Sequence, residues 1–121
     1  MTIENGRLIP ADKVEGTSVF NPKGDKLGEI ENILIDKISG KVAYADMAFG
    51  GFLGMGDKHH PLPWSVLSYD TNKGGFVINL DKKMLENAPS YDPEDAAEVD
   101  WGDEAWGRKL HDYYGVQPYW I

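Results

Sequence analysis

Cysteine is absent from this chain of 121 residues, and histidine occurs only three times. Without thiols the chain can form no disulfide and offers no thiolate ligand or nucleophile. No apolar run approaches the roughly 20 residues that a membrane-spanning helix needs. The polar start, residues 1–7, lacks the basic and apolar regions of a signal peptide. We therefore expect a cytoplasmic protein without membrane insertion.

An excess of positive charge is also missing, since the formal net charge is −8. A chain this acidic repels a phosphate backbone, so we expect no direct nucleic-acid binding. The charge is uneven, because residues 92–121 carry eight carboxylates against two basic side chains. This step in composition predicts a boundary near Ser90. The expected segments are an N-terminal lead-in (1–13), a barrel domain (14–90) and an acidic, aromatic, helical tail (91–121).

Turn-forming residues are abundant, with 14 glycines and 7 prolines, and they favour many short strands over a helical bundle. A shift in apolar phase between Ile30 and Ile33 predicts a bulge. Prolines 61 and 63 place their strand at a sheet edge. The alternating and β-branched runs predict strands within 16–20, 27–36, 41–49 and 58–63, near Tyr69, and within 76–80.

Both faces of the run 41–49 are apolar apart from Asp46, so we expect this strand inside the sheet. Asp46 would then be paired, at a rim or at an interface, and the pattern leaves these three alternatives open. Residues 14–81 should form the barrel. Its expected core includes Val19, Ile33, Ile35, Tyr44, Met47, Phe76 and Ile78.

Two helices are expected toward the C-terminus. Asp81 is suited to cap a short helix over 82–87, which Pro89 ends. Asp103 is suited to cap a helix over 104–114, with Gly115 as its C-cap. Six of the chain's fourteen aromatic residues follow residue 100. Their helical spacing leaves three alternatives: packing on the barrel, crossing to another subunit, or disorder until a partner binds.

Six segments in this order resemble those of a known family. They lie within residues 16–20, 24–31, 35–44, 49–58, 63–67 and 81–89. With them the chain resembles the PRC-barrel domain, which occurs in the photosynthetic reaction-centre H subunit and in a ribosome-maturation factor. The resemblance implies an all-β fold: a small barrel of about six short strands with one short helix, here followed by a C-terminal helical extension. It supplies no common catalytic motif.

Side-chain patterns typical of enzymes are weak. His59 and His60 are adjacent on an expected strand, so they point to opposite faces and could not easily share a metal ion. The glycines between 50 and 56 do not match phosphate-loop spacings, and no serine lies in a nucleophile elbow. We therefore expect no enzyme activity, no catalytic residues, no metal site and no cofactor.

The expected function is that of a non-catalytic protein-binding or scaffold module whose protein partner is unknown, with self-association as a two-fold homodimer. Two alternatives remain open. One is an accessory to a membrane photosynthetic complex that aids docking or proton transfer, as the resemblance implies. The other is a small-ligand protein or enzyme with a pocket at the barrel mouth.

The expected interaction residues are large apolar side chains in two places. One place is the glycine-rich loop, which either folds back on its own barrel or contacts another protein. The other is the aromatic tail. The residues are Phe52, Leu53, Met55, Trp101, Trp106, Tyr113, Tyr114 and Trp120.

Overall fold

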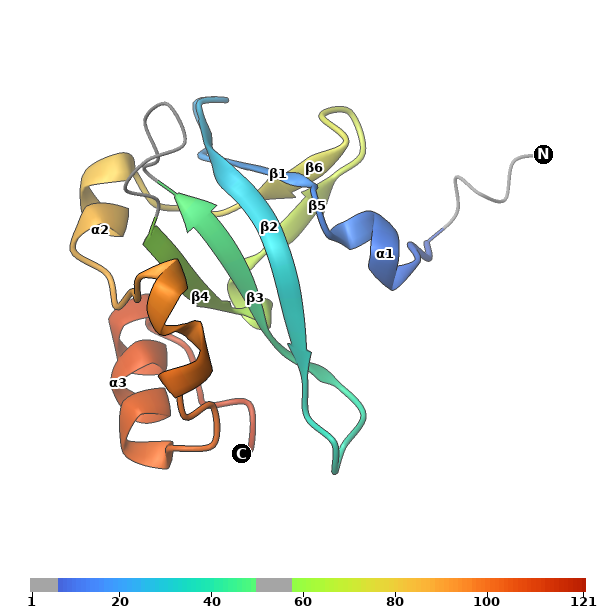
Figure 1. The fold of residues 1–121 in the computed structure, drawn as a ribbon. Coiled ribbons are helices and arrows are strands. Elements are labelled where there is room, and N and C mark those ends of the chain that lie inside the picture. Colours follow the sequence, from blue (N-terminus) through green and yellow to red (C-terminus); the bar gives the residue numbers. More distant parts are fainter. Residues whose placement is uncertain (1–6, 50–57) are drawn as a thin grey trace.

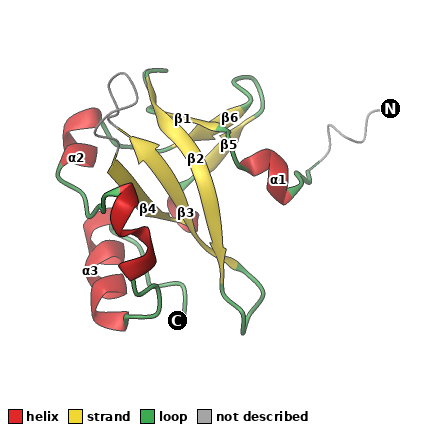
Figure 2. Ribbon diagram, in the orientation of Figure 1, coloured by secondary structure: helices red, strands yellow, loops and turns green. Residues whose placement is uncertain are grey.

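The computed structural model describes residues 7–49 and 58–121. Its six strands form a single open, mixed sheet (Figures 1 and 2). The expected six strands are confirmed, whereas closure into a barrel is not. The sheet order is β4-β3-β2-β1-β6-β5, and only the β1–β6 pair is parallel. The strands are β1 (Ser18–Phe20), β2 (Lys26–Ile35), β3 (Val42–Phe49), β4 (Lys58–Pro63), β5 (Ser68–Asp70) and β6 (Gly75–Val77).

Prolines explain why the sheet ends at β4. The backbone of His59 faces away from β3, because its N–H and carbonyl bond to Tyr91 at 2.9 and 3.0 Å. Since backbone groups alternate along a strand, Pro61 and Pro63 also face outward. Neither has an N–H to donate, so another strand could not continue the ladder there. The predicted edge position of β4 is confirmed.

The long hairpin of β2 and β3 contains the predicted bulge. Pairing shifts register between Ile30 and Asn32, which leaves Glu31 as the extra residue. β3 lies between β2 and β4, which confirms its expected interior position. At the far end, Gly40 adopts a φ of 78°, the left-handed conformation that glycine tolerates without strain. The turn between the two strands projects from the body (Figure 1).

Short helices accompany the sheet. Both predicted caps are confirmed: the Asp81 carboxylate accepts from the Met84 N–H at 2.8 Å, and the Asp103 carboxylate accepts from the Ala105 N–H at 3.0 Å. Two short helices, α1 and η3, lie where the sequence predicted none. The helical elements are α1 (Ala11–Val14), η2 (Trp64–Val66), α2 (Lys82–Glu86), η3 (Pro93–Glu98) and α3 (Glu104–Tyr114). Within the described residues, no helix combines the length and apolar character needed to cross a bilayer.

The main core fills the inner face of the curved sheet. Five of the seven predicted core residues are buried: Val19, Tyr44, Met47, Phe76 and Ile78. Ile33 is partly buried and packs against this core. Ile35 is 55% exposed, so its prediction was wrong. Ile35 is the last residue of β2, next to the turn that projects from the body, so its side chain lies beyond the main core although the alternation along β2 continues to it (Figure 1).

A second cluster lies between the sheet and the C-terminal segment, defined here as residues 91–121. Tyr44 on β3 and Leu110 on α3 are its largest buried members, and Trp101 and Trp106 pack against them. Figure 1 shows η3 and α3 beside β3 and β4, on the opposite side of the molecule from α1. The aromatic tail therefore packs on its own sheet, the first of the three alternatives.

Phe76 provides a direct test of the main core. It is 4% exposed, and its ring meets Trp64 and Tyr69 edge-on at centroid distances of 5.5 and 5.1 Å. Phe76→Ala should lower the free energy of unfolding by about 3–5 kcal/mol, because it leaves a cavity between these rings. Chemical denaturation measures this change. Leu8→Ala is the control, since Leu8 is 90% exposed and the change should alter stability by less than about 0.5 kcal/mol. A loss below about 1 kcal/mol for Phe76→Ala would contradict the described packing.

Candidate functional site: a polar network and a pocket beside the C-terminal segment

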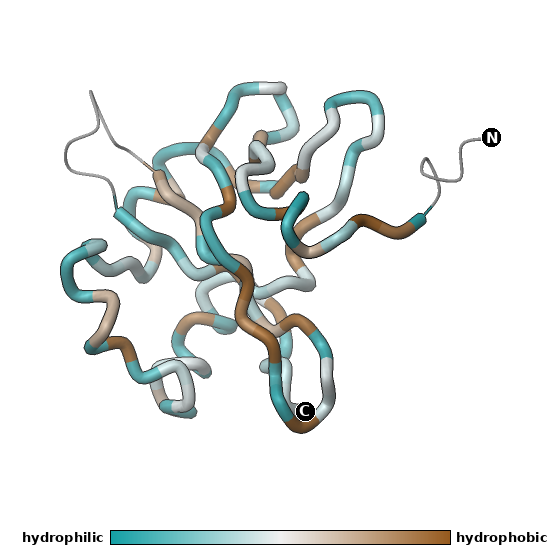
Figure 3. Tube along the Cα trace, turned by 45° about the vertical axis from the view of Figure 1, so that its right-hand side comes forward, coloured by the Kyte–Doolittle hydropathy of each residue, from teal (hydrophilic) through white to brown (hydrophobic). Residues whose placement is uncertain are grey.

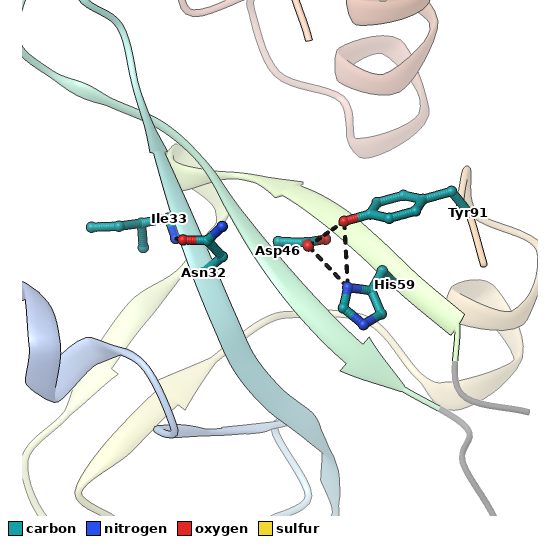
Figure 4. A network of polar contacts seen from close by, with 5 residues as sticks. All are labelled: Asn32, Ile33, Asp46, His59 and Tyr91. Carbon is teal, nitrogen blue, oxygen red and sulfur yellow. Dashed lines mark hydrogen bonds and ion pairs between the residues drawn. The ribbon is translucent and has the colours of Figure 1, made fainter. Parts of the chain in front are cut away.

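Asp46 is a buried carboxylate on β3, with 3% of its surface exposed. A buried charge requires hydrogen-bond partners. Its Oδ2 atom accepts a short hydrogen bond from the Tyr91 hydroxyl and lies 3.0 Å from His59 Nδ1 (Figure 4). Of the three alternatives for Asp46, the structure shows a paired residue. Its Oδ1 atom is buried without a partner among the described residues.

Tyr91 joins the C-terminal segment to the sheet edge through both backbone and side chain. Its backbone N–H and carbonyl exchange hydrogen bonds with His59, at 3.0 and 2.9 Å. Its hydroxyl donates to Asp46. Burial, and then the bond to Asp46, raise the pKa of Tyr91 above its usual range. The phenol therefore stays protonated at neutral pH and remains a donor, so Asp46, His59 and Tyr91 form a clasp.

The two adjacent histidines point to opposite faces, as predicted. His59 takes part in the clasp, whereas His60 is 2% exposed and packs edge-on against Phe49 at 5.2 Å. Burial lowers the pKa of His60 to about 4, and the imidazole is therefore neutral at pH 7. Its Nδ1 atom has no partner among the described residues. The two imidazoles cannot bind one metal ion in this arrangement.

One group of carboxylates was considered as a metal site. Oxygen atoms of Asp92, Glu94 and Asp95 lie within 4.8 Å of one another. The ammonium group of Lys58 already lies 2.9 Å from Asp92, and the hydrogen bond and charge of Asp92 raise the pKa of Lys58. Glu94 and Asp95 are exposed. Because exposed acidic clusters are common without an ion, we assign no metal to this group.

Tyr44 is the centre of the aromatic contacts on the C-terminal segment. Its ring centroid lies 6.0 Å from Trp106, 5.5 Å from His111 and 5.4 Å from Tyr119. Gly107 allows this approach, since a Cβ atom there would lie 2.9 Å from Trp120 and 3.2 Å from the Tyr44 hydroxyl. Burial raises the pKa of Tyr44, and its hydroxyl has no partner among the described residues. The cluster fixes α3 against β3.

A pocket of about 440 Å³ opens between the sheet and the last turn of the chain, and we name it the seam pocket. Its walls are mostly apolar, with a few polar groups from Ser65, Gln117 and Tyr119. His111 also lines it, and its Nδ1 donates to the Gly107 carbonyl at 2.7 Å. The lining residues are Val42, Ala43, Pro63, Trp64, Ser65, His111, Val116, Gln117, Pro118 and Tyr119.

Sequence reasoning did not foresee the clasp or the seam pocket. The break in the apolar pattern of β3 identified Asp46 as unusual, but nothing in the local sequence linked it to Tyr91, 45 residues away. The walls of the seam pocket come from three parts of the chain that are distant in sequence, residues 42–43, 63–65 and 111–119. The alternative of a pocket at the barrel mouth named none of them.

The predicted interaction residues fall into two groups. Phe52, Leu53 and Met55 lie outside the described residues. The five tail aromatics contact their own chain, and Tyr113, which is 36% exposed, donates a short hydrogen bond to the Met84 carbonyl. A role for any of these residues in binding another protein stays a prediction. The partly buried ones are Trp101, Trp106, Tyr114 and Trp120.

Comparison with known proteins assigns the family. The model of the PRC-barrel domain matches residues 7–85, and the chain belongs to this family. No curated protein matches it. Among solved structures, the chain is similar to RimM from Pseudomonas aeruginosa, which is named as a 16S ribosomal RNA processing protein. The identity is 22% and the TM-score 0.42, and the match covers 62% of this chain and 45% of that one.

The clasp and the seam pocket both extend past the end of the family match. Asp46 and His59 lie inside residues 7–85, whereas Tyr91 follows them. Likewise, Val42 and Trp64 belong to the matched region, while His111 and Tyr119 do not. Both features therefore depend on how this chain adds its C-terminal segment to the sheet.

The clasp can be tested by removing one oxygen atom. Tyr91→Phe keeps the ring but deletes the hydroxyl that donates to Asp46, so the buried carboxylate loses a partner. We expect the free energy of unfolding to fall by about 1–3 kcal/mol. Tyr69→Phe is the matched control, because Tyr69 is 45% exposed and should change stability by less than about 0.5 kcal/mol. Equal, small effects of the two variants in denaturant titrations would show that the clasp contributes nothing.

Proposed function

We propose that this protein is a non-catalytic protein-binding module that docks through the seam pocket and the surface around it. The observation that supports this most directly is the pocket itself: about 440 Å³, mostly apolar, with a few polar groups at its walls. This volume lies within the roughly 300–1,000 Å³ typical of binding pockets. It is large enough to admit one or two apolar side chains of a partner.

Exposed apolar side chains at this end of the molecule also support docking of a partner there. Tyr119 lines the pocket and is 37% exposed, and Ile121, two residues on, is 73% exposed. Ile35 and Ile38, on the β2–β3 hairpin, are 55% and 96% exposed. The C-terminus and this hairpin lie at the same end of the molecule in Figures 1 and 3. Grouped apolar exposure of this kind is typical of protein-contact surfaces.

The polar side chains of the site support binding rather than catalysis. Nucleophilic catalysis needs a nucleophile within hydrogen-bond reach of a base. Ser65 makes no hydrogen bond to a histidine in the described part of the chain, and the Nδ1 atom of His111 is engaged by the Gly107 carbonyl. The Tyr91 hydroxyl donates a hydrogen bond to the Asp46 carboxylate. His111, Asp46 and Tyr91 are thus engaged in hydrogen bonds that position the chain.

Affinity capture from a lysate of the native cell tests the proposal. The bait variants are the unchanged protein, Ser65→Arg, which fills the seam pocket from an exposed position, and Leu8→Ser, a change at a residue that is 90% exposed and outside the pocket. We expect a partner that the unchanged protein and Leu8→Ser both retain. Ser65→Arg should lower its recovery at least about tenfold, equivalent to about 1.4 kcal/mol.

The partner must then bind as a purified protein in isothermal titration, with the same order among the three variants. If the Ser65→Arg bait recovers as much of the partner as the unchanged protein does, the seam pocket is rejected as the docking site. Absence of any partner above the level of a blank matrix would reject the binding function as proposed.

A further inference from the structure

The turn of the β2–β3 hairpin, residues 36–41, carries one exposed apolar side chain, two lysines and one carboxylate, and we name it the knob. Ile38, at its tip, is 96% exposed, and Lys37 and Lys41 flank it. The turn is held by its own bonds: the Asp36 carboxylate accepts from the Ser39 hydroxyl at 2.8 Å and from the Ile38 N–H at 3.1 Å. This knob has a fixed shape and presents its side chain to solvent.

The seam pocket has the complementary properties. Its walls are mostly apolar. Burial raises the pKa of Tyr119, which lines the pocket, and the charges of Asp36 and Glu104 raise it further. The C-terminal segment as a whole has eight carboxylates and two basic side chains. The pocket therefore suits an apolar side chain that has lysines next to it in the same turn.

The knob does not fill the pocket of its own chain, since Ile38 stays almost fully exposed. Hairpin and C-terminus nevertheless lie at the same end of the molecule (Figures 1 and 3). Val42, which lines the pocket, starts the strand that follows the turn. A two-fold axis at this end would let each of two copies offer its knob to the other's pocket at once.

We propose that the occupant of the seam pocket is a second copy of this chain, with Ile38 of each copy inserted into the pocket of the other. Lys37 and Lys41 then face Asp36 and Glu104 of the opposite copy. This inference rests on the proposed docking function and names its occupant. The pairing is reciprocal and closed, so it gives a dimer and no longer assembly.

Light scattering with size exclusion, across micromolar to hundreds of micromolar protein, measures the assembly. The full chain should have twice the mass of one 13.5 kDa chain. Ile38→Asp and Ser65→Arg should each give a monomer, with the dissociation constant raised at least about 100-fold, since each places a charge in the apolar contact. Leu8→Asp, an equally drastic change at a residue that is 90% exposed, should stay dimeric.

Mixing the two monomeric variants gives the sharpest result. In a mixed pair, one contact is the unchanged knob in the unchanged pocket. The other contact brings the two introduced charges, which have opposite signs, together. An equimolar mixture of Ile38→Asp and Ser65→Arg should therefore recover a dimer that neither variant forms alone. Circular dichroism of each variant confirms that it is folded, as expected for exposed positions.

Three outcomes overturn the inference: a monomer at every concentration, a dimer that survives both single variants, or a mixture that remains monomeric. A monomeric protein that still captures a partner sensitive to Ser65→Arg would refute the second copy and leave the proposed docking function standing. An intact, knob-dependent dimer that captures no other protein would support the second copy as the occupant and reject docking of a different protein.

Discussion

The constraint on which the rest of this structure depends is the burial of two β3 residues, Tyr44 and Asp46, beneath the C-terminal segment. Burial of the Tyr44 ring is favourable in itself, because it removes apolar surface from water. Burial of the Asp46 carboxylate is costly unless the carboxylate is hydrogen-bonded. The segment meets both needs. Tyr91 donates a hydrogen bond to Asp46, which also contacts His59 of β4, while Trp106 and His111 pack around Tyr44.

The same segment explains how an open sheet of this kind is protected at its β4 edge. Pro61 and Pro63 have no N–H to offer at this edge, and the N–H and carbonyl of His59 are already hydrogen-bonded to Tyr91. With that edge closed to strand addition, contact with another protein at β4 has to use side chains. The seam pocket forms where the segment ends against β3 and η2, so the packing that stabilises the fold also creates the proposed docking surface.

Local features were predictable from the sequence, and long-range ones were not. Alternation, turn residues and caps predicted the six strands, the bulge near Glu31 and the two capped helices, because each depends on neighbours along the chain. The predicted burial of Ile35 was wrong because this residue ends β2 next to the projecting turn, and alternation alone does not show how far the core extends along a strand. Closure of the barrel was not observed, since it depends on which edges meet in space. The partners of Asp46 and the walls of the seam pocket come from segments distant in sequence, and no periodicity links them.

The measurement that tests the central claim most directly is native-state hydrogen exchange on the full chain, resolved by residue. If burial of Tyr44 and Asp46 joins the C-terminal segment to the sheet, the amides of α3 and of β3 should open together. Their free energies of opening should then agree within about 1 kcal/mol. Exchange of the α3 amides at a free energy several kcal/mol below that of β3 would contradict the account, because the segment could then detach while the sheet beneath it remained folded.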